Sequence, residues 1–184
     1  EYEKAIADYT EAIRLKPNYA KAYTNRGYAY LVTDDNDKAI ADFTQAIRLN
    51  PNYAAVYTNR GIAYNKKGEH EKAIADLTEA IRLKPNFATA YYNRGLAYDE
   101  KGESEKAIAD FTEVIRLKPN YAYVYTNRGY AYLYMGKFDK AIADSTQAIR
   151  LKPNDAKAYN NRGDAYNEKG EYEKAIADYT EAIR

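Results

Sequence analysis

The sequence predicts an all-α fold in which antiparallel helix pairs follow one another along a linear array. The chain repeats itself every 34 residues, the apolar residues of each repeat follow helical spacing, and Pro-Asn pairs separate the repeats. The period is plainest at two sets of residues: Gly27, Gly61, Gly95, Gly129 and Gly163, and Pro17, Pro51, Pro85, Pro119 and Pro153. Units of this length bury their apolar faces only against neighbouring units, so we expect a solenoid rather than one compact core.

We divide the expected array, residues 1–184, into a partial repeat and five further repeats. Residues 1–19 are the second helix of the partial repeat plus a linker. The repeats then span 20–53, 54–87, 88–121, 122–155 and 156–184, and the last is incomplete at its C-terminal loop.

Each repeat contains two short helices. In the first, Asn18 is expected to cap a helix that runs to about Thr33, and a second helix spans Asp37 to Leu49,. The short break between the helices holds a glycine in the other repeats, at Gly68, Gly102, Gly136 and Gly170. Glycine can take the left-handed conformation that ends a helix. The first repeat has Asp34 in that place, a residue type that tolerates positive φ,.

The two helices have faces that fit closely together. One face of the first helix carries Tyr23, Arg26, Gly27 and Tyr30,. The second helix carries an apolar stripe of Ala39, Ile40, Phe43, Ala46 and Ile47. Glycine inside a helix costs about 1 kcal/mol of helix propensity. Its presence in every repeat therefore indicates close contact between the two backbones, with the aromatic rings above and below.

An arginine on this packed face needs a partner, because an isolated buried charge is very unfavourable. The second helix supplies an aspartate at a constant place beside its apolar stripe. We predict a structural ladder of arginine–aspartate pairs, formed by Arg26, Arg60, Arg94, Arg128 and Arg162 with Asp42, Asp76, Asp110, Asp144 and Asp178. The alternative is a row of arginines that binds anions.

The repeat resembles the tetratricopeptide repeat (TPR). The residues that carry the resemblance are, in the first repeat, Tyr23, Gly27, Tyr30, Ala39, Phe43, Ala46 and Pro51. The family implies a right-handed superhelical solenoid whose first helices line a concave groove. Its members mostly act as protein-interaction scaffolds that bind peptides or partner domains in this groove. The chain departs from the family in having tyrosine for the usual tryptophan and arginine for the usual leucine.

If the first helices line the groove, its constant polar residue is an asparagine: Asn25, Asn59, Asn93, Asn127 and Asn161. A side-chain amide has both donors and an acceptor, so it can bind the backbone of an extended peptide. This row is similar to the asparagine ladder of O-linked N-acetylglucosamine transferases. The alternative is that each asparagine bonds the backbone of a neighbouring helix and holds the repeats in register.

Variable residues on the same faces should set specificity. The tyrosines in this group are Tyr28, Tyr92, Tyr123, Tyr130 and Tyr134. Tyrosine offers a large contact area and a polar tip at little entropic cost, which suits a binding surface. The structural alternative is that some of these rings pack against the next repeat. The fifth repeat instead has Asp164, Asn167 and Glu168, so the groove is expected to become acidic there.

Composition argues against other classes of function. The net charge is +1, from 28 basic and 27 acidic residues, which gives little attraction for nucleic acid or an anionic membrane,. One histidine and no cysteine leave no catalytic triad or zinc site,. We therefore expect no enzyme activity, no cofactor and no metal. With no signal peptide or membrane-spanning run in the sequence, we assign the cytoplasm by default.

Residues 1–14 and 171–184 are identical, and both are second helices of a repeat. Neither end has the polar capping helix that usually finishes a solenoid. We expect a fragment of a longer array that associates head to tail. Peptide binding in the groove is the leading hypothesis, and the alternatives are a self-assembling array or the substrate-recruiting region of a larger enzyme.

Overall fold

The computed structural model describes residues 1–184 as eleven α-helices without a β-strand. The helices are α1 (Tyr2–Leu15), α2 (Ala20–Val32), α3 (Asn36–Leu49), α4 (Ala54–Lys66), α5 (His70–Leu83), α6 (Ala88–Glu100), α7 (Ser104–Leu117), α8 (Ala122–Tyr134), α9 (Phe138–Leu151), α10 (Ala156–Glu168) and α11 (Tyr172–Ile183). The all-α prediction is confirmed. We call the even-numbered helices A helices and the odd-numbered ones B helices.

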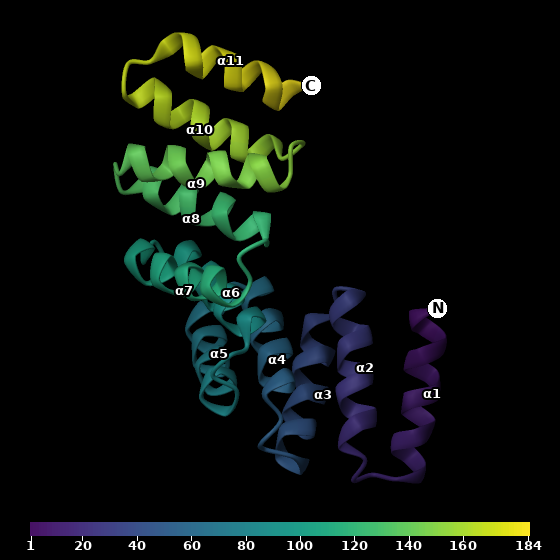
Figure 1. Cartoon of the computed structure of the whole chain (residues 1–184). Coiled ribbons are helices and arrows are strands. Elements are labelled where there is room, and N and C mark those ends of the chain that lie inside the picture. Colours follow the sequence, from purple (N-terminus) through teal and green to yellow (C-terminus); the bar gives the residue numbers. More distant parts are fainter. The chain divides into compact units, whose positions relative to one another are not determined.

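The chain forms two compact units, Glu1–Ala97 and Tyr98–Arg184, with the division inside α6. In the first unit, α1 to α4 lie side by side in chain order, and successive helices run in opposite directions (Figure 1). In the second unit, α8 to α11 follow the same plan (Figure 1).

The core of each unit lies between A and B helices. In the first unit, Phe43 of α3 is fully buried, with Ala39 and Ala46 on the same helix and Val56 and Ala63 on α4. The next cluster repeats this arrangement, with a leucine at the centre, Leu77 of α5. In the second unit the fully buried side chains include Phe111, Val114 and Val124. One B helix therefore packs between two A helices, as expected for a repeat array.

The expected cap of the first A helix is wrong. The N-cap residue of α2 is Tyr19, and no side chain caps this helix. Asn18 lies one residue earlier, in a turn that is closed by a bond from the Tyr19 amide to the Lys16 carbonyl at 3.1 Å. The Pro-Asn pair therefore serves as a turn, and its asparagine is too far back to cap the helix.

The turns within repeats match the prediction. The backbone φ is +75° at Gly68, Gly102 and Gly170 and +68° at Gly136. Asp34 has a φ of +63° and is the non-glycine residue with positive φ. The left-handed residue reverses the chain between an A helix and its B helix, and aspartate adopts it with little strain.

The mid-helix glycine permits the close contact between A and B helices. A Cβ atom on Gly27 would come within 2.8 Å of the Phe43 ring, and one on Gly61 would come within 2.8 Å of Leu77. The side chain over the glycine is thus that of the residue 16 positions later, and at Gly61 the Ala73 carbonyl oxygen also lies 3.3 Å from the position of an added Cβ. At Gly129 that residue is Ser145, and the nearest contact is 3.1 Å.

Substituting these glycines tests the close packing. Gly27→Ala should destabilise the chain by about 1 kcal/mol, because overpacking costs about 1–3 kcal/mol and exceeds the helix-propensity gain of about 1 kcal/mol. Gly129→Ala is the matched control and should be neutral or stabilising, because the Ser145 side chain is small. Urea unfolding followed by circular dichroism measures both. Equal effects at the two positions would contradict this explanation.

Candidate functional site

Arginine–aspartate pairs connect the A and B helices. Nε and Nη2 of Arg26 donate to the two carboxylate oxygens of Asp42 at 2.7 and 2.8 Å. The same bidentate ion pair joins Arg60 to Asp76, Arg128 to Asp144 and Arg162 to Asp178. The aspartate side chains are only 7–10% exposed and those of the arginines 16–19%. These pairs follow the predicted ladder, and the pairing of Arg94 with Asp110 or Asp76 stays a prediction.

The carboxylates further favour the charged form of these partly buried arginines. Hydrogen bonding to Asp42 raises the pKa of Arg26 above its usual value. At Arg60, burial lowers the pKa, but the hydrogen bonds and charge of Asp76 outweigh it, so the pKa is raised overall. Arg26 also lies 5.8 and 6.0 Å from the ring centroids of Tyr23 and Tyr30, which adds a cation–π attraction,.

The sequence analysis missed a third member of this cluster, a threonine. Nη1 of each arginine donates to the threonine of the preceding B helix at 2.9–3.1 Å. The threonines are Thr10, Thr44, Thr78, Thr112 and Thr146. The sequence could have indicated these threonines, because each one follows the constant aspartate of its helix by two residues. At Arg26, Arg60, Arg128 and Arg162 three nitrogens donate within the chain, which favours a structural role over an anion-binding row.

The five asparagines that recur every 34 residues are half-buried and have different surroundings. Nδ2 of Asn25 donates to the Tyr9 hydroxyl at 3.3 Å, and that of Asn93 to the Thr89 carbonyl of its own helix at 2.7 Å. Nδ2 of Asn161 donates to the Thr126 carbonyl on α8 at 3.0 Å. Asn161 thus makes the register bond that was the alternative to peptide binding. Peptide binding by the asparagine row stays a prediction.

A stripe of exposed tyrosines covers one face of α8. Tyr123, Tyr130 and Tyr134 are 46%, 49% and 73% exposed, and Asn127 lies between the first two at helical spacing. We call these four residues the α8 stripe. Lys152 Nζ donates to the Tyr123 hydroxyl at 2.7 Å and fixes that ring. Of the other predicted tyrosines, Tyr28 is 50% exposed, whereas Tyr92 is half-buried.

A neighbouring A helix extends this surface with polar groups. α10 carries exposed Lys157, Asp164 and Glu168 at places equivalent to the three tyrosines. Two bonds hold α10 against α8: the Asn161 bond described above, and one from the Thr126 hydroxyl to Asp155 at 2.9 Å. An aromatic face and an acidic face therefore lie next to each other in the second unit.

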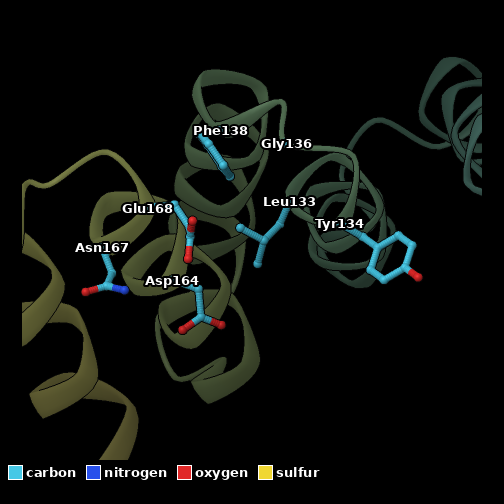
Figure 2. A pocket seen from close by; sticks show the side chains of 7 residues that line it. All are labelled: Leu133, Tyr134, Gly136, Phe138, Asp164, Asn167 and Glu168. Atoms are coloured by element: carbon cyan, nitrogen blue, oxygen red, sulfur yellow. The ribbon is translucent and has the colours of Figure 1, made fainter.

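An open pocket of about 410 Å³ lies where these two faces meet. Its lining residues are Leu133, Tyr134, Gly136, Phe138, Asp164, Asn167 and Glu168. Figure 2 shows the carboxylates of Asp164 and Glu168 on the same side as Leu133, with the Tyr134 ring directed away from them. The pocket therefore combines an apolar wall with two exposed acids.

One of the two acids is held in place. The Tyr179 hydroxyl donates to Asp164 at 2.8 Å. Burial, together with this bond, raises the pKa of Tyr179 to about 12. Tyr179 therefore remains a hydrogen-bond donor to Asp164 at physiological pH.

A second pocket, of about 330 Å³, lies in the first unit beside Asn25. Tyr19, Lys21, Asn50 and Tyr53 also line it. The surface of this unit is thus hollowed at the start of an A helix, whereas the pocket in the second unit lies at the helix ends.

Other kinds of site are not apparent in the structure. No group of three or more histidine, cysteine, aspartate or glutamate residues is arranged to hold a metal ion. None of the helices has the length and apolar character needed to span a membrane.

Family models identify the repeat. Models described as "TPR repeat" match residues 1–32 and 63–102, and models described as "Tetratricopeptide repeat" match 20–53, 43–75, 88–121 and 126–184. No curated protein matches the sequence. The chain belongs to the tetratricopeptide repeat family, whose fold is that of protein-interaction scaffolds.

Solved structures of the same fold are similar over most of the chain. A crystal structure of MamA is 30% identical, has a TM-score of 0.82, and the match covers 89% of this chain and 90% of MamA. MamA from Desulfovibrio magneticus RS-1 is 22% identical, with a TM-score of 0.84 and coverage of 89% and 93%. YrrB, described as a TPR protein with an unusual peptide-binding site, is 22% identical, with a TM-score of 0.80 and coverage of 95% and 90%.

Removing one arginine tests the contribution of the ladder. Arg60→Ala should destabilise the chain by about 3 kcal/mol, because it leaves the Asp76 carboxylate buried without its partner. Replacing both residues with apolar ones, as in Arg60→Met with Asp76→Leu, should destabilise it less. Arg82→Ala is the matched control, since Arg82 is exposed and pairs with Glu79 on the same helix surface; its effect should be below about 1 kcal/mol. Urea unfolding measures all three, and similar losses for Arg60→Ala and Arg82→Ala would refute a buried ladder.

Proposed function

We propose that the chain is a non-catalytic scaffold that binds an extended segment of a partner protein across the exposed faces of its A helices. The observation that carries this proposal is the α8 stripe, in which three tyrosines are about half or more exposed on one helix face. Tyr123 also bonds Lys152, but each of the three rings still presents 46% or more of its surface to solvent. They are also the residue type that contributes most to binding hot spots.

The adjacent pocket indicates which side chain the partner contributes. Asp164 and Glu168 provide negative charge, and Leu133 and Phe138 provide an apolar wall. A lysine or arginine side chain has an aliphatic stem and a charged end, so it matches both parts. Because exposed ion pairs contribute only about 0.2–1 kcal/mol, we assign the acids to selectivity and the tyrosines to affinity.

Two further points support a protein partner. YrrB, which shares the fold, is described as having a peptide-binding site. The net charge of +1 provides little long-range attraction for nucleic acid or an anionic membrane,. In the first unit we propose a separate set of peptide-binding residues, Tyr28, Asn25 and Asn59 together with Tyr92 and Asn93 of α6.

Peptide binding can be tested with a peptide array, followed by fluorescence anisotropy on the selected sequences. Tyr130→Ala should weaken the selected peptides about tenfold, as expected for an aromatic anchor. The pair Asp164→Asn and Glu168→Gln should remove the preference for a lysine over the uncharged norleucine at one peptide position.

The control is Glu173→Gln, which neutralises one carboxylate on α11, away from the proposed surface. This substitution should leave both the peptide affinity and the preference for lysine over norleucine unchanged. If the selected peptides bind both Tyr130→Ala and the doubly neutralised variant as tightly as they bind the unsubstituted chain, with the same preference for lysine, the site lies elsewhere.

A second candidate function is head-to-tail association of copies, favoured by the exposure of apolar residues on the terminal helices. Leu15 of α1 is 70% exposed, and Ile176 and Ile183 of α11 are 65% and 87% exposed. The two ends present different faces, so contact between them propagates rather than closing as a dimer. Light scattering should show a mass that rises with concentration, and Ile183→Glu should lower it. A constant monomer mass would eliminate this candidate.

A further inference from the structure

The pocket of about 330 Å³ in the first unit lies between the start of α2, the end of α3 and the residue that precedes α4. We call it the first-unit pocket. Its walls include two tyrosines, Tyr19 and Tyr53, which are 39% and 47% exposed. Lys21 and Asn25 line it from one face of α2, and Asn50 directly follows α3,. All of these residues belong to the first unit, so the pocket forms within one packed body.

One residue in a linker leaves this pocket open. The second linker has Asn50 before its proline, whereas the other four have a lysine there: Lys16, Lys84, Lys118 and Lys152. In two of these linkers the lysine lies over the aromatic ring three residues later, with Nζ 5.4 Å from the Tyr19 centroid and 4.8 Å from the Phe87 centroid. The shorter, uncharged Asn50 side chain cannot cover Tyr53 in this way. The Tyr53 ring is therefore available to a ligand.

In the second unit the equivalent place is filled. The linker lysine there is Lys152, whose Nζ donates to the Tyr123 hydroxyl at 2.7 Å and lies 4.3 Å from the centroid of that ring. Asp155, at the place of the second tyrosine of the pocket, is buried and accepts from the Thr126 hydroxyl at 2.9 Å. The polar groups at this place are thus bonded to one another, which leaves none of them for a ligand.

The free polar groups of the first-unit pocket are mostly donors. Asn50 Oδ1 accepts a backbone amide hydrogen at 3.4 Å, and both hydrogens of its Nδ2 are unused. The Lys21 ammonium and the hydroxyls of Tyr19 and Tyr53 make no hydrogen bond within the chain. Asn25 donates to a tyrosine on α1, so its oxygen is a free acceptor. No carboxylate lines the pocket.

We propose that the first-unit pocket binds a proline-containing segment of the partner protein in the polyproline II conformation. Such a segment has no internal hydrogen bonds, so its carbonyl oxygens are free to accept, and its prolines have no N–H to satisfy. It therefore matches a pocket that has several donors and few acceptors. The proline rings pack against Tyr19 and Tyr53, which is how aromatic-lined grooves recognise proline.

The proposal rests on the proposed function, because the segment belongs to the same protein partner, but it does not use the α8 stripe. The volume of about 330 Å³ is near the lower end of the range of about 300–1,000 Å³ for ligand pockets, so the pocket holds one or two residues rather than a folded domain,. An acidic segment also offers acceptors. We favour proline because Lys21 is the one cation in the lining, and exposed ion pairs contribute little to affinity,.

A fluorescein-labelled decaproline peptide is the probe, and its fluorescence anisotropy is followed during titration with the full chain. A peptide of the same length with alternating serine and alanine is measured beside it. Decaproline should bind saturably and about tenfold more tightly than the second peptide, because it is already in the bound conformation and loses less entropy on binding.

Substitutions assign the binding to the first-unit pocket. Asn50→Lys introduces the residue of the other linkers, so the chain should fold, and it should weaken decaproline binding about tenfold because the lysine covers an anchoring ring. Tyr53→Ala should weaken it to a similar extent, and Tyr53→Phe only about threefold, since it removes one hydrogen bond and keeps the ring. Asn52→Lys is the matched control, because it adds the same charge in the same linker outside the pocket. It should leave decaproline affinity unchanged.

Several outcomes would overturn the proposal. One is an absence of saturable decaproline binding, and another is equal affinity of Asn50→Lys and Asn52→Lys for decaproline. Tighter binding of decaglutamate, lost in Lys21→Gln, would make an acidic segment the ligand. Tyr130→Ala should leave decaproline binding unchanged, and a loss there would place the contact on the α8 stripe. If the array-selected peptides fail on α8 while decaproline still binds, the proposed function fails and the first-unit pocket stands.

Discussion

The fold depends on one charged contact, the arginine that links three helices. Its Nε and Nη2 atoms bind an aspartate of the following B helix, and its Nη1 atom binds a threonine of the preceding one. A leucine in this place would fill the space but would have no preferred partner. The planar guanidinium fixes both neighbours at once, because its donors have a rigid geometry that matches a carboxylate. The contact therefore sets the register of α2, α4, α8 and α10, each between its two neighbouring B helices.

Buried charge of this kind is acceptable only when every partner is supplied. The two carboxylate oxygens, the threonine hydroxyl and the flanking tyrosine rings together replace the water that the guanidinium loses. The glycine beside the arginine brings the B helix close enough for these short bonds. Small residues and charged residues thus depend on each other: the close approach permits the pair, and the pair offsets the cost of placing a charge there.

This arrangement also explains where binding surfaces are available. Each helix uses its small and aromatic residues for packing, so the remaining face of each A helix varies between repeats without disturbing the fold. In the second unit that face is aromatic on α8 and acidic on α10, and a pocket forms where they meet.

The sequence by itself determined the helices, their pairing, the left-handed turn residues and the presence of arginine–aspartate pairs. These features are periodic, and a feature that recurs every 34 residues can be assigned from spacing alone,. Tertiary structure decided the rest. The Tyr19 start of α2, the role of threonine, the separate partners of Asn25, Asn93 and Asn161, and the pocket at Asp164 depend on how side chains of different helices meet. Such contacts change with shifts of about 1 Å, because hydrogen bonds form only within a narrow range of distance, and spacing along the chain does not specify position at that scale.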